Sequence, residues 1–321
     1  MATDSSLWAN NGGVISSPPL SEKMRRSAQP LYRFRAFVDT KDALGKSQGD
    51  TFNWDKVANP TTIGGTLTET STVPLTAQVI TKGTLTVDEY GNGIPMTRKI
   101  EELSQFDMEQ VIEKGLRDDM AGVLDAAAHA QFNNTLLRYV GTTTAGGVLT
   151  TNGTATATNN SVLNELHIRK MVLELEKRNV PTLSGDTYAG IFSLEAVESL
   201  RGAMVSVNQY TEMGYQKIVS GEVGMVHGVR IIKDNNATRF TYSLSARTKT
   251  AKSWTNSQAL EGFIFGQDTV TEAVVVPEEI RPKEVTDFGR SKGLCWYFLG
   301  GWKITWDSAG DQRILKWDSA A

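Results

Sequence analysis

Thiol and imidazole side chains are scarce in this 321-residue sequence, which contains one cysteine and three histidines. A disulfide or a thiolate metal cluster needs at least two cysteines. Because Cys295 is the single cysteine of the sequence, neither can form within one chain. The histidines lie far apart in the sequence and show no metal-ligand spacing: His129, His167 and His227. Stability must therefore come from packing and from neighbouring molecules, and a histidine-based catalytic or metal site has little support.

Motifs of the common catalytic sites are absent as well. The sequence has no P-loop, no GxGxxG dinucleotide turn, no GxSxG nucleophile elbow and no HExxH zinc helix. Three pairs of adjacent carboxylates occur, but neighbours on a helix differ by about 100° in direction, so we interpret them as solvated charge: Glu101 with Glu102, Asp118 with Asp119, and Glu278 with Glu279. We therefore expect no catalytic residue, no cofactor and no metal, and a protein that is not an enzyme.

Long apolar runs and a strong net charge are also missing. No stretch approaches the ~20 apolar residues that span a bilayer, and the first residues lack the basic-then-apolar order of a signal peptide. We expect a protein that has no membrane partner and is synthesised in a cytoplasm. With 33 basic and 36 acidic residues the formal charge is -3, which provides no general attraction to nucleic acid.

What the sequence does contain begins with a basic segment interrupted by prolines. Residues 1–30 are rich in serine, asparagine, glycine and proline, and they predict an extended arm with a short helix at 21–28. This arm is either solvated or docked on an acidic neighbour, and both interpretations stay open. The basic residues between positions 22 and 41 outnumber Glu22 and Asp39: Lys23, Arg25, Arg26, Arg33, Arg35 and Lys41.

A polar tract that favours β-structure follows at residues 45–95, with ten threonines between positions 61 and 86. Residues 51–57 and 78–87 alternate well enough to predict the two strands of a long hairpin. A two-stranded ribbon is marginal by itself and exposes unpaired strand edges, so the hairpin should lie on something. Its own chain is one candidate surface, but its length and polarity favour an arm that lies across an adjacent subunit.

A long helix is predicted from residue 101 to about residue 137. Apolar residues recur every four positions, and each step of four advances about 40° beyond a full turn, so the apolar line winds around the helix. We expect a spine that packs successively against different elements rather than on one sheet. The line comprises Met108, Ile112, Leu116, Met120, Leu124, Ala128, Phe132 and Leu136.

The remaining sequence predicts an α/β region and then mainly strands, so the expected fold class is α+β. A hairpin turn is expected at Asn152 and Gly153, and a helix at 194–200 that Ser193 caps and Gly202 ends. A further helix is expected at 162–178, and strands at 188–192, 229–233, 261–265, 270–276, 294–307 and 313–317. Four tryptophans predict one aromatic core in the closing sheet: Trp296, Trp302, Trp306 and Trp317.

The order of these parts resembles the capsid-protein fold typified by bacteriophage Hong Kong ninety-seven. More narrowly, the sequence is similar to the major capsid family named after the coat protein of the phage N-four, over about residues 30–318. The resemblance is carried by VITKGTLTVDEYGNGIPMTRKIEELSQFDM at 79–108, YAGIFSLEAVESLRG at 188–202 and GEVGMVHGVRIIKDNNATRF at 221–240.

This resemblance implies five regions. They are an N-terminal arm at 1–44, an extended β-hairpin loop at 45–95, a peripheral domain with the spine helix at 96–140, an axial α/β domain at 141–260, and a closing β ribbon at 261–321 that returns to the axial domain. Some relatives form isopeptide cross-links between a lysine in the extended loop and a distant asparagine, but Lys56 and Lys82 cannot be matched to that position.

The implied function is that of a major capsid protein. It would self-assemble into hexamers and pentamers of an icosahedral phage head in the bacterial cytoplasm, reside in the virion, and enclose double-stranded DNA without sequence-specific binding. A separate scaffold or decoration protein is a candidate partner. The expected assembly-interface residues lie in the arm and the extended loop: Arg25, Arg26, Arg33, Arg35, Trp54, Lys56, Lys82, Asp88 and Glu89.

Other classes of function stay open at this stage. A phage tail or tube protein predicts filaments, and an adhesive module predicts a small oligomer. A cytosolic enzyme with its site between two lobes predicts a discrete pocket with perturbed ionisable groups.

Overall fold

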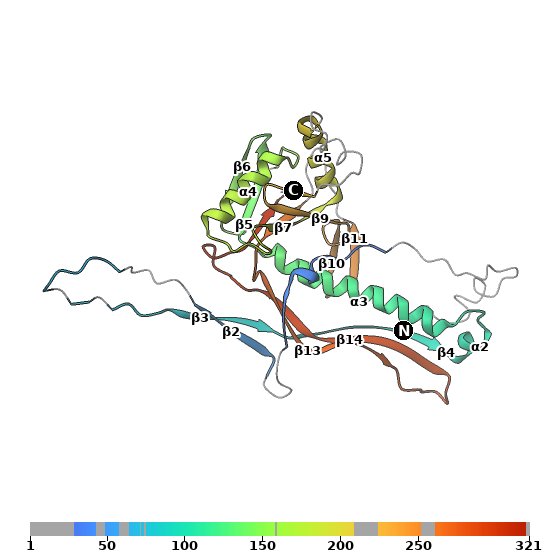
Figure 1. Cartoon of the computed structure of the whole chain (residues 1–321). Coiled ribbons are helices and arrows are strands. Elements are labelled where there is room, and N and C mark those ends of the chain that lie inside the picture. The colour runs from blue at the N-terminus through green and yellow to red at the C-terminus, as the bar shows by residue number, and fades with distance from the viewer. Residues whose placement is uncertain are drawn as a thin grey trace.

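The computed structural model describes residues 29–42, 49–57, 64–70, 72–73, 75–157, 159–208, 224–251 and 261–318, with the side chains of 202–208 excepted. The fold is a mixed α+β structure in which strands predominate. Figure 1 shows a globular lobe above an elongated one, with a thin hairpin that projects to one side. The predicted helix at 21–28 lies outside the described residues.

The globular lobe is built on a seven-stranded sheet in the order β6-β5-β15-β12-β7-β9-β8. Its two helices are α4 (Glu165–Lys177) and α5 (Leu194–Asn208). Every residue of β7 is buried, as expected for a central strand. The strands are β5 (Leu137–Thr143), β6 (Gly146–Thr150), β7 (Tyr188–Ser193), β8 (Met225–Val226), β9 (Val229–Asp234), β12 (Gly262–Phe265) and β15 (Ile314–Trp317).

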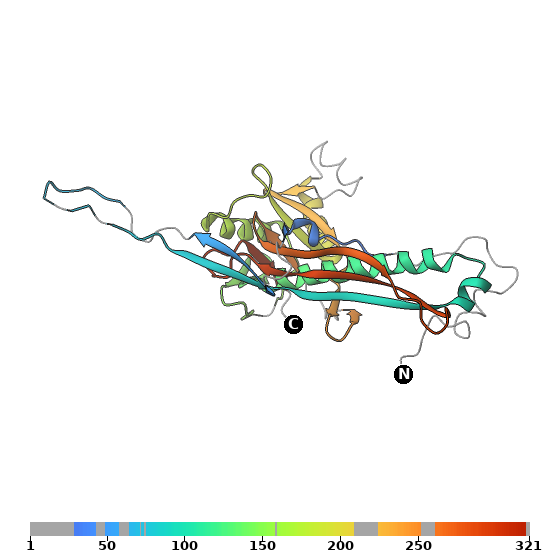
Figure 2. The same ribbon diagram turned by 90° about the horizontal axis from the view of Figure 1, so that it is seen from below.

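The elongated lobe combines a four-stranded sheet with the longest helix. The sheet order is β1-β13-β14-β4, and Figure 2 shows its long strands running beside α3 (Met108–Asn133). The short helix α2 (Arg98–Leu103) follows β4 directly. The strands are β1 (Asp39–Asp42), β4 (Asp88–Thr97), β13 (Val270–Pro282) and β14 (Ser291–Ile304). None of the helices in the described part of the chain is long and apolar enough to cross a membrane.

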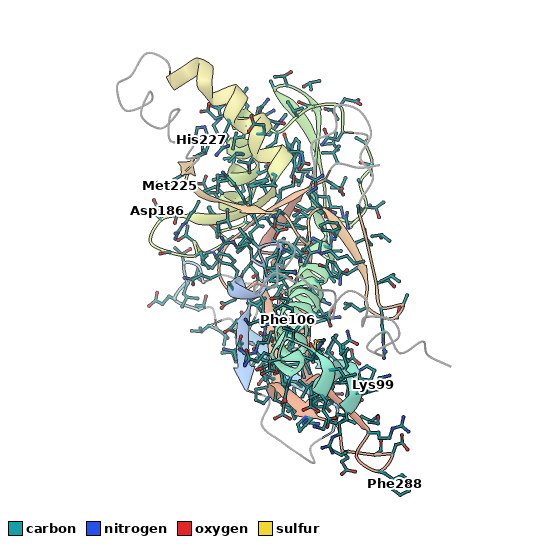
Figure 3. All side chains as sticks on the ribbon, turned by 90° about the vertical axis from the view of Figure 1, so that its right-hand side faces the viewer. Lys99, Phe106, Asp186, Met225, His227 and Phe288 are labelled. Atoms are coloured by element: carbon teal, nitrogen blue, oxygen red, sulfur yellow. The ribbon has the colours of Figure 1, made fainter. Side chains whose placement is uncertain are left out.

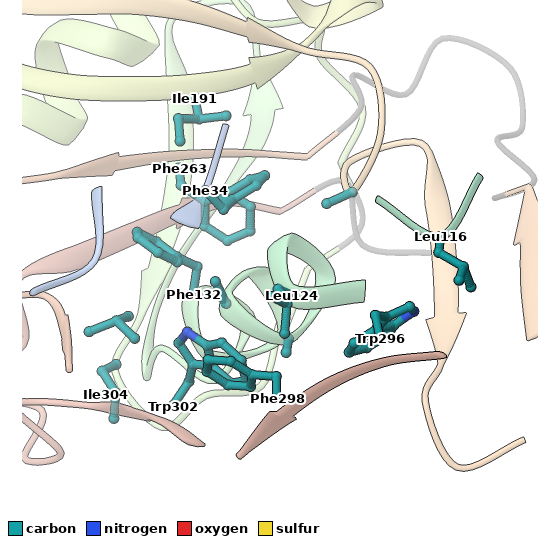
Figure 4. Packing of buried hydrophobic residues seen from close by; sticks show 14 of the residues in the cluster. Phe34, Leu116, Leu124, Phe132, Ile191, Phe263, Trp296, Phe298, Trp302 and Ile304 are labelled. Carbon is teal, nitrogen blue, oxygen red and sulfur yellow. The ribbon is translucent and has the colours of Figure 1, made fainter. Parts of the chain in front are cut away.

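The described residues form two hydrophobic cores. The sequence had predicted that four tryptophans would share one aromatic core. Trp296 and Trp302 lie between α3 and the four-stranded sheet, as Figure 4 shows. Trp317 lies in the other core, stacked on Tyr139 at 5.9 Å between ring centroids. The single aromatic core was therefore a wrong prediction, because β14 and β15 are consecutive strands that belong to different sheets.

The spine helix differs from its prediction at both ends. The side chain of Asp107 accepts a hydrogen bond from the backbone N–H of Glu109 (3.1 Å) and caps α3 at Met108, which leaves α2 as a separate helix. The helix ends at Asn133, and Leu137 already begins β5. One long side of α3 lies on β14, β13 and β4, with further contacts to β15 and the 3-10 turn η1 (Arg35–Phe37). We predicted that the spine helix would pack against several elements rather than on one sheet. It does contact several elements, but its main partner is the four-stranded sheet, so the prediction was only partly right.

Two local predictions in the globular lobe were wrong. The hairpin turn falls at Thr144 and Ala145, between β5 and β6, whereas Asn152 and Gly153 form a bend held by the bond from Gly153 N–H to the carbonyl of Leu136 (3.0 Å). Helix α5 starts at the predicted Ser193 cap but continues through Gly202. A mid-helix glycine costs only about 1 kcal/mol, which neighbouring helical residues can offset.

Candidate assembly surfaces

The projecting hairpin has the predicted strands. β2 (Thr51–Val57) pairs antiparallel with β3 (Ile80–Thr86) in a two-stranded sheet separate from both main sheets. Figures 1 and 2 show it extending away from the body, as its polar composition predicted. Its described residues expose several apolar side chains to solvent: Val57, Leu67, Val73, Leu75, Val79 and Ile80. These side chains have no core to enter in the isolated subunit.

The paired strands of the hairpin are fixed to the body by close packing and by an ion pair. Leu85 is only 2% exposed, and it packs over Gly301 of β14, where a β-carbon would collide with the carbonyl of Thr86. Lys56 is 7% exposed, and its ammonium group lies 2.6 Å from the carboxylate of Asp307. The Lys56 ammonium lowers the pKa of Asp307. The paired strands are therefore held at both ends of their pairing, by Leu85 at one end and by Lys56 at the other. The described residues of the loop between the strands are exposed.

The projecting part is shorter than the loop predicted at 45–95. β4 continues the chain directly after β3 and pairs with β14 from Asp88 opposite Gly300 to Thr97 opposite Ser291. Residues 88–95 are therefore part of the four-stranded sheet. The alternation of β4 resembles that of β3, so the sequence alone does not separate a projecting strand from one that joins a sheet.

The interface residues predicted in the loop have different surroundings. Trp54 is half-buried over Gly83, and Lys82 is exposed opposite Asp55. Asp88 and Glu89 are exposed at the start of β4, where Glu89 accepts a hydrogen bond from the Tyr297 hydroxyl (3.0 Å). Lys56, by contrast, is engaged within its own chain. Contacts with a neighbouring subunit remain a prediction for all of these residues.

The predicted N-terminal arm belongs partly to the body. Phe34 is fully buried in the core, and β1 pairs in parallel with β13. The Arg35 guanidinium lies 2.9 Å from Glu272 and 3.1 Å from Glu278, and it lowers the pKa of Glu278. Arg33 is exposed. Arg25 and Arg26 lie outside the described residues.

A buried carboxylate fastens this segment to the spine helix. Asp125, 1% exposed, accepts hydrogen bonds from the backbone N–H groups of Phe34 (2.8 Å) and Arg35 (3.1 Å). Burial raises the pKa of Asp125 to about 6, and Asp234 contributes to the rise. Because an acid inside a helix is usually solvated, the sequence carried no signal for this role.

The three histidines lie in separate places. His129 is buried beside the rings of Phe34 and Phe263. A ring nitrogen of His167 lies 2.8 Å from the carbonyl of Thr143, and burial lowers the pKa of this imidazole. His227 lies 2.7 Å from Glu165. Among the described residues, no group of three histidine, cysteine or acidic side chains is arranged to hold a metal.

A second exposed apolar surface lies at the far end of the elongated lobe. Phe288, at the turn between β13 and β14, is fully exposed, and Val285 and Leu103 are also exposed. Figure 3 shows Phe288 at the extremity of the molecule, at the opposite end from Met225 and His227. Sequence reasoning missed this site, although a phenylalanine in the turn segment Asp287-Phe288-Gly289 was a usable signal.

Solved structures of phage capsids share this fold from end to end. The capsid structure of the cyanophage P-SCSP1u matches with a TM-score of 0.68 and 12% sequence identity, over 100% of this chain and 98% of that one. The head structure of the Helicobacter pylori bacteriophage KHP40 matches with 0.68 and 13%, over 94% of each chain. The cyanophage Pam1 capsid matches with 0.62 and 13%, over the whole of both chains. No protein-family model and no curated protein matches the sequence.

Proposed function

We propose that this chain is the major capsid protein of a tailed phage, a structural subunit without enzymatic activity. The observation that carries the proposal is the exposed loop between β2 and β3, on a body whose fold matches phage capsid proteins over its full length. A ribbon that exposes six large apolar side chains needs a covering surface, and a neighbouring copy in a closed shell supplies one in every position.

The proposed assembly consists of hexamers and pentamers in an icosahedral head that encloses double-stranded DNA. Repeated heterologous contacts form closed rings, and the hairpin and arm absorb the small differences between six-fold and five-fold settings. In this scheme the arm is the part of residues 1–44 that precedes the buried Phe34, and the extended loop is the part of residues 45–95 that precedes β4. The peripheral domain takes in α3 with β13 and β14, and the seven-stranded lobe is the axial domain. The subunit assembles in the host cytoplasm, with a separate scaffold or decoration protein as a partner.

Electron microscopy of the purified protein tests this function. The full chain is expected to give closed shells, and replacement of residues 64–79 by a short glycine-serine turn is expected to abolish them. The described residues that this change removes are exposed and lie beyond the β2–β3 pairing, so circular dichroism and the unfolding midpoint should stay the same. Filaments from the full chain would identify a tube protein instead, and shells from the shortened variant would contradict the role of the hairpin.

A further inference from the structure

A cleft of about 600 Å³ opens between α3, β4 and the small hairpin of β10 (Phe240–Ser243) and β11 (Thr248–Ala251). Its walls carry aromatic rings, including Tyr32, Tyr242 and Trp296. Its carboxylates come from Asp118 and Asp119 of α3 and from Glu89 of β4. Glu89 is the one described residue of the predicted assembly interface that lines this cleft.

The chemistry of the cleft suits a cationic side chain. The carboxylate of Asp119 is held in place by hydrogen bonds from Trp296 Nε1 and Asn92 Nδ2, both at 2.9 Å. Two basic side chains line the cleft, Arg247 and Lys249. The ammonium of Lys249 lies over the Phe240 ring (4.2 Å) and bonds to Asn236 (3.2 Å). Carboxylates beside aromatic faces bind guanidinium groups through charge-assisted hydrogen bonds and cation–π contacts.

The described chain begins at this cleft. Gln29, the first described residue, is one of the residues that line it. Further along, the Tyr32 hydroxyl donates to the carbonyl of Asp118 (3.2 Å), and the Phe34 N–H bonds to Asp125. From Phe34 back to Tyr32, the contact on α3 shifts from Asp125 to Asp118, which lines the cleft. The chain before Tyr32 therefore runs towards the cleft.

The residues just before Gln29 match this site in charge. Segment 21–28 has the sequence SEKMRRSA, with Lys23, Arg25 and Arg26 against one acid, Glu22. Arg26 is three residues from Gln29, a span of at most about 11 Å, so its side chain can reach the carboxylates. We propose that segment 21–28 docks in the cleft of its own chain, with Arg25 and Arg26 directed at Asp118 and Asp119. This proposal concerns the single subunit and does not rest on the capsid function.

Disulfide trapping in the full-length chain tests the proposal. With the native thiol removed (Cys295→Ser), cysteines are placed by Met24→Cys in the segment and Ser245→Cys on the rim of the cleft. Mild oxidation is expected to join them within one chain, seen as a faster band on a non-reducing gel and a linked peptide by mass spectrometry. Pairing Met24→Cys with the exposed Ser308→Cys, outside the cleft, serves as the matched control and should give little product.

Charge reversal tests whether the cross-link depends on binding of the arginines in the cleft or only on the short chain that joins the segment to the body. In the trapping pair, Arg25→Glu with Arg26→Glu is expected to lower the intrachain product about fivefold, and adding Asp118→Arg should recover part of it. Circular dichroism verifies that each variant is folded. An unchanged yield after reversal, no product in the original pair, or links only between different chains would each overturn the proposal. The last result would place the segment on a neighbouring copy.

Discussion

At the scale of single residues, Asp125 combines a structural contact with an electrostatic cost. Its carboxylate holds the backbone of Phe34 and Arg35, yet burial raises its pKa from 3.8 to about 6. The folded state therefore binds this proton more tightly than the unfolded state. Stability falls as the pH rises from about 4 to about 6, and the full cost, about 3 kcal/mol, is present above that window.

Asp125→Asn is therefore expected to gain stability relative to the parent as pH rises. The difference between variant and parent in the free energy of unfolding should increase by about 2–3 kcal/mol from pH 4 to pH 7. Urea unfolding at both pH values measures it. Asp55→Asn, on the exposed β2, controls for a change of charge at a solvated position. A difference that is the same at both pH values would contradict the assigned cost.

Leu124 represents the core formed by α3 and the four-stranded sheet. It is fully buried in the apolar cluster, so Leu124→Ala is expected to cost about 2–5 kcal/mol through lost burial and a residual cavity. Leu173→Ala is the matched control on α4, because that side chain is about half exposed, and it should change stability by less than about 1 kcal/mol. If Leu124→Ala and Leu173→Ala lower the free energy of unfolding equally, Leu124 does not lie in the core.

At the scale of elements, the close approach of β3 to β14 decides how the hairpin is anchored. A β-carbon at Gly301 would collide with the carbonyl of Thr86 and with Leu85. Gly301→Ala is therefore expected to cost about 1–3 kcal/mol and to speed amide exchange in residues 80–87. Gly310→Ala, whose β-carbon would meet nothing within 4 Å, is the control. Unaltered exchange in β3 would mean that the strand does not depend on this contact.

Local sequence patterns predicted the positions of most strands and helices, but they predicted the ends of these elements less accurately. The alternation in β2 and the buried run in β7 predicted both strands with small errors. The start of α3 was missed because Asp107 was not weighed as a cap, although a residue of that type before an apolar period is a start signal. The turn at Thr144 was missed because Asn152-Gly153 is the stronger turn sequence, and tertiary contacts overrode it.

At the scale of the whole molecule, the tip at Phe288 is expected to matter only after assembly. Its side chain is fully exposed and contributes no packing within the subunit, so Phe288→Ser should leave the unfolding midpoint unchanged. In a shell, an exposed aromatic ring at the end of an elongated lobe is a natural contact point, and the yield of particles by sedimentation should fall. Normal yields of shells would remove Phe288 from the assembly surface.

The sequence by itself determined the α+β class, most strand positions, the polar character of the projecting hairpin and the absence of common catalytic motifs. These properties depend on periodicity and residue type within short segments, which act before any long-range contact forms. Only the tertiary structure decided that Phe34 enters the core, that β1 joins β13 in parallel, and that β14 and β15 separate into two sheets. A local pattern indicates which face of a segment is buried, whereas the choice of partner depends on how distant apolar surfaces fill a common space.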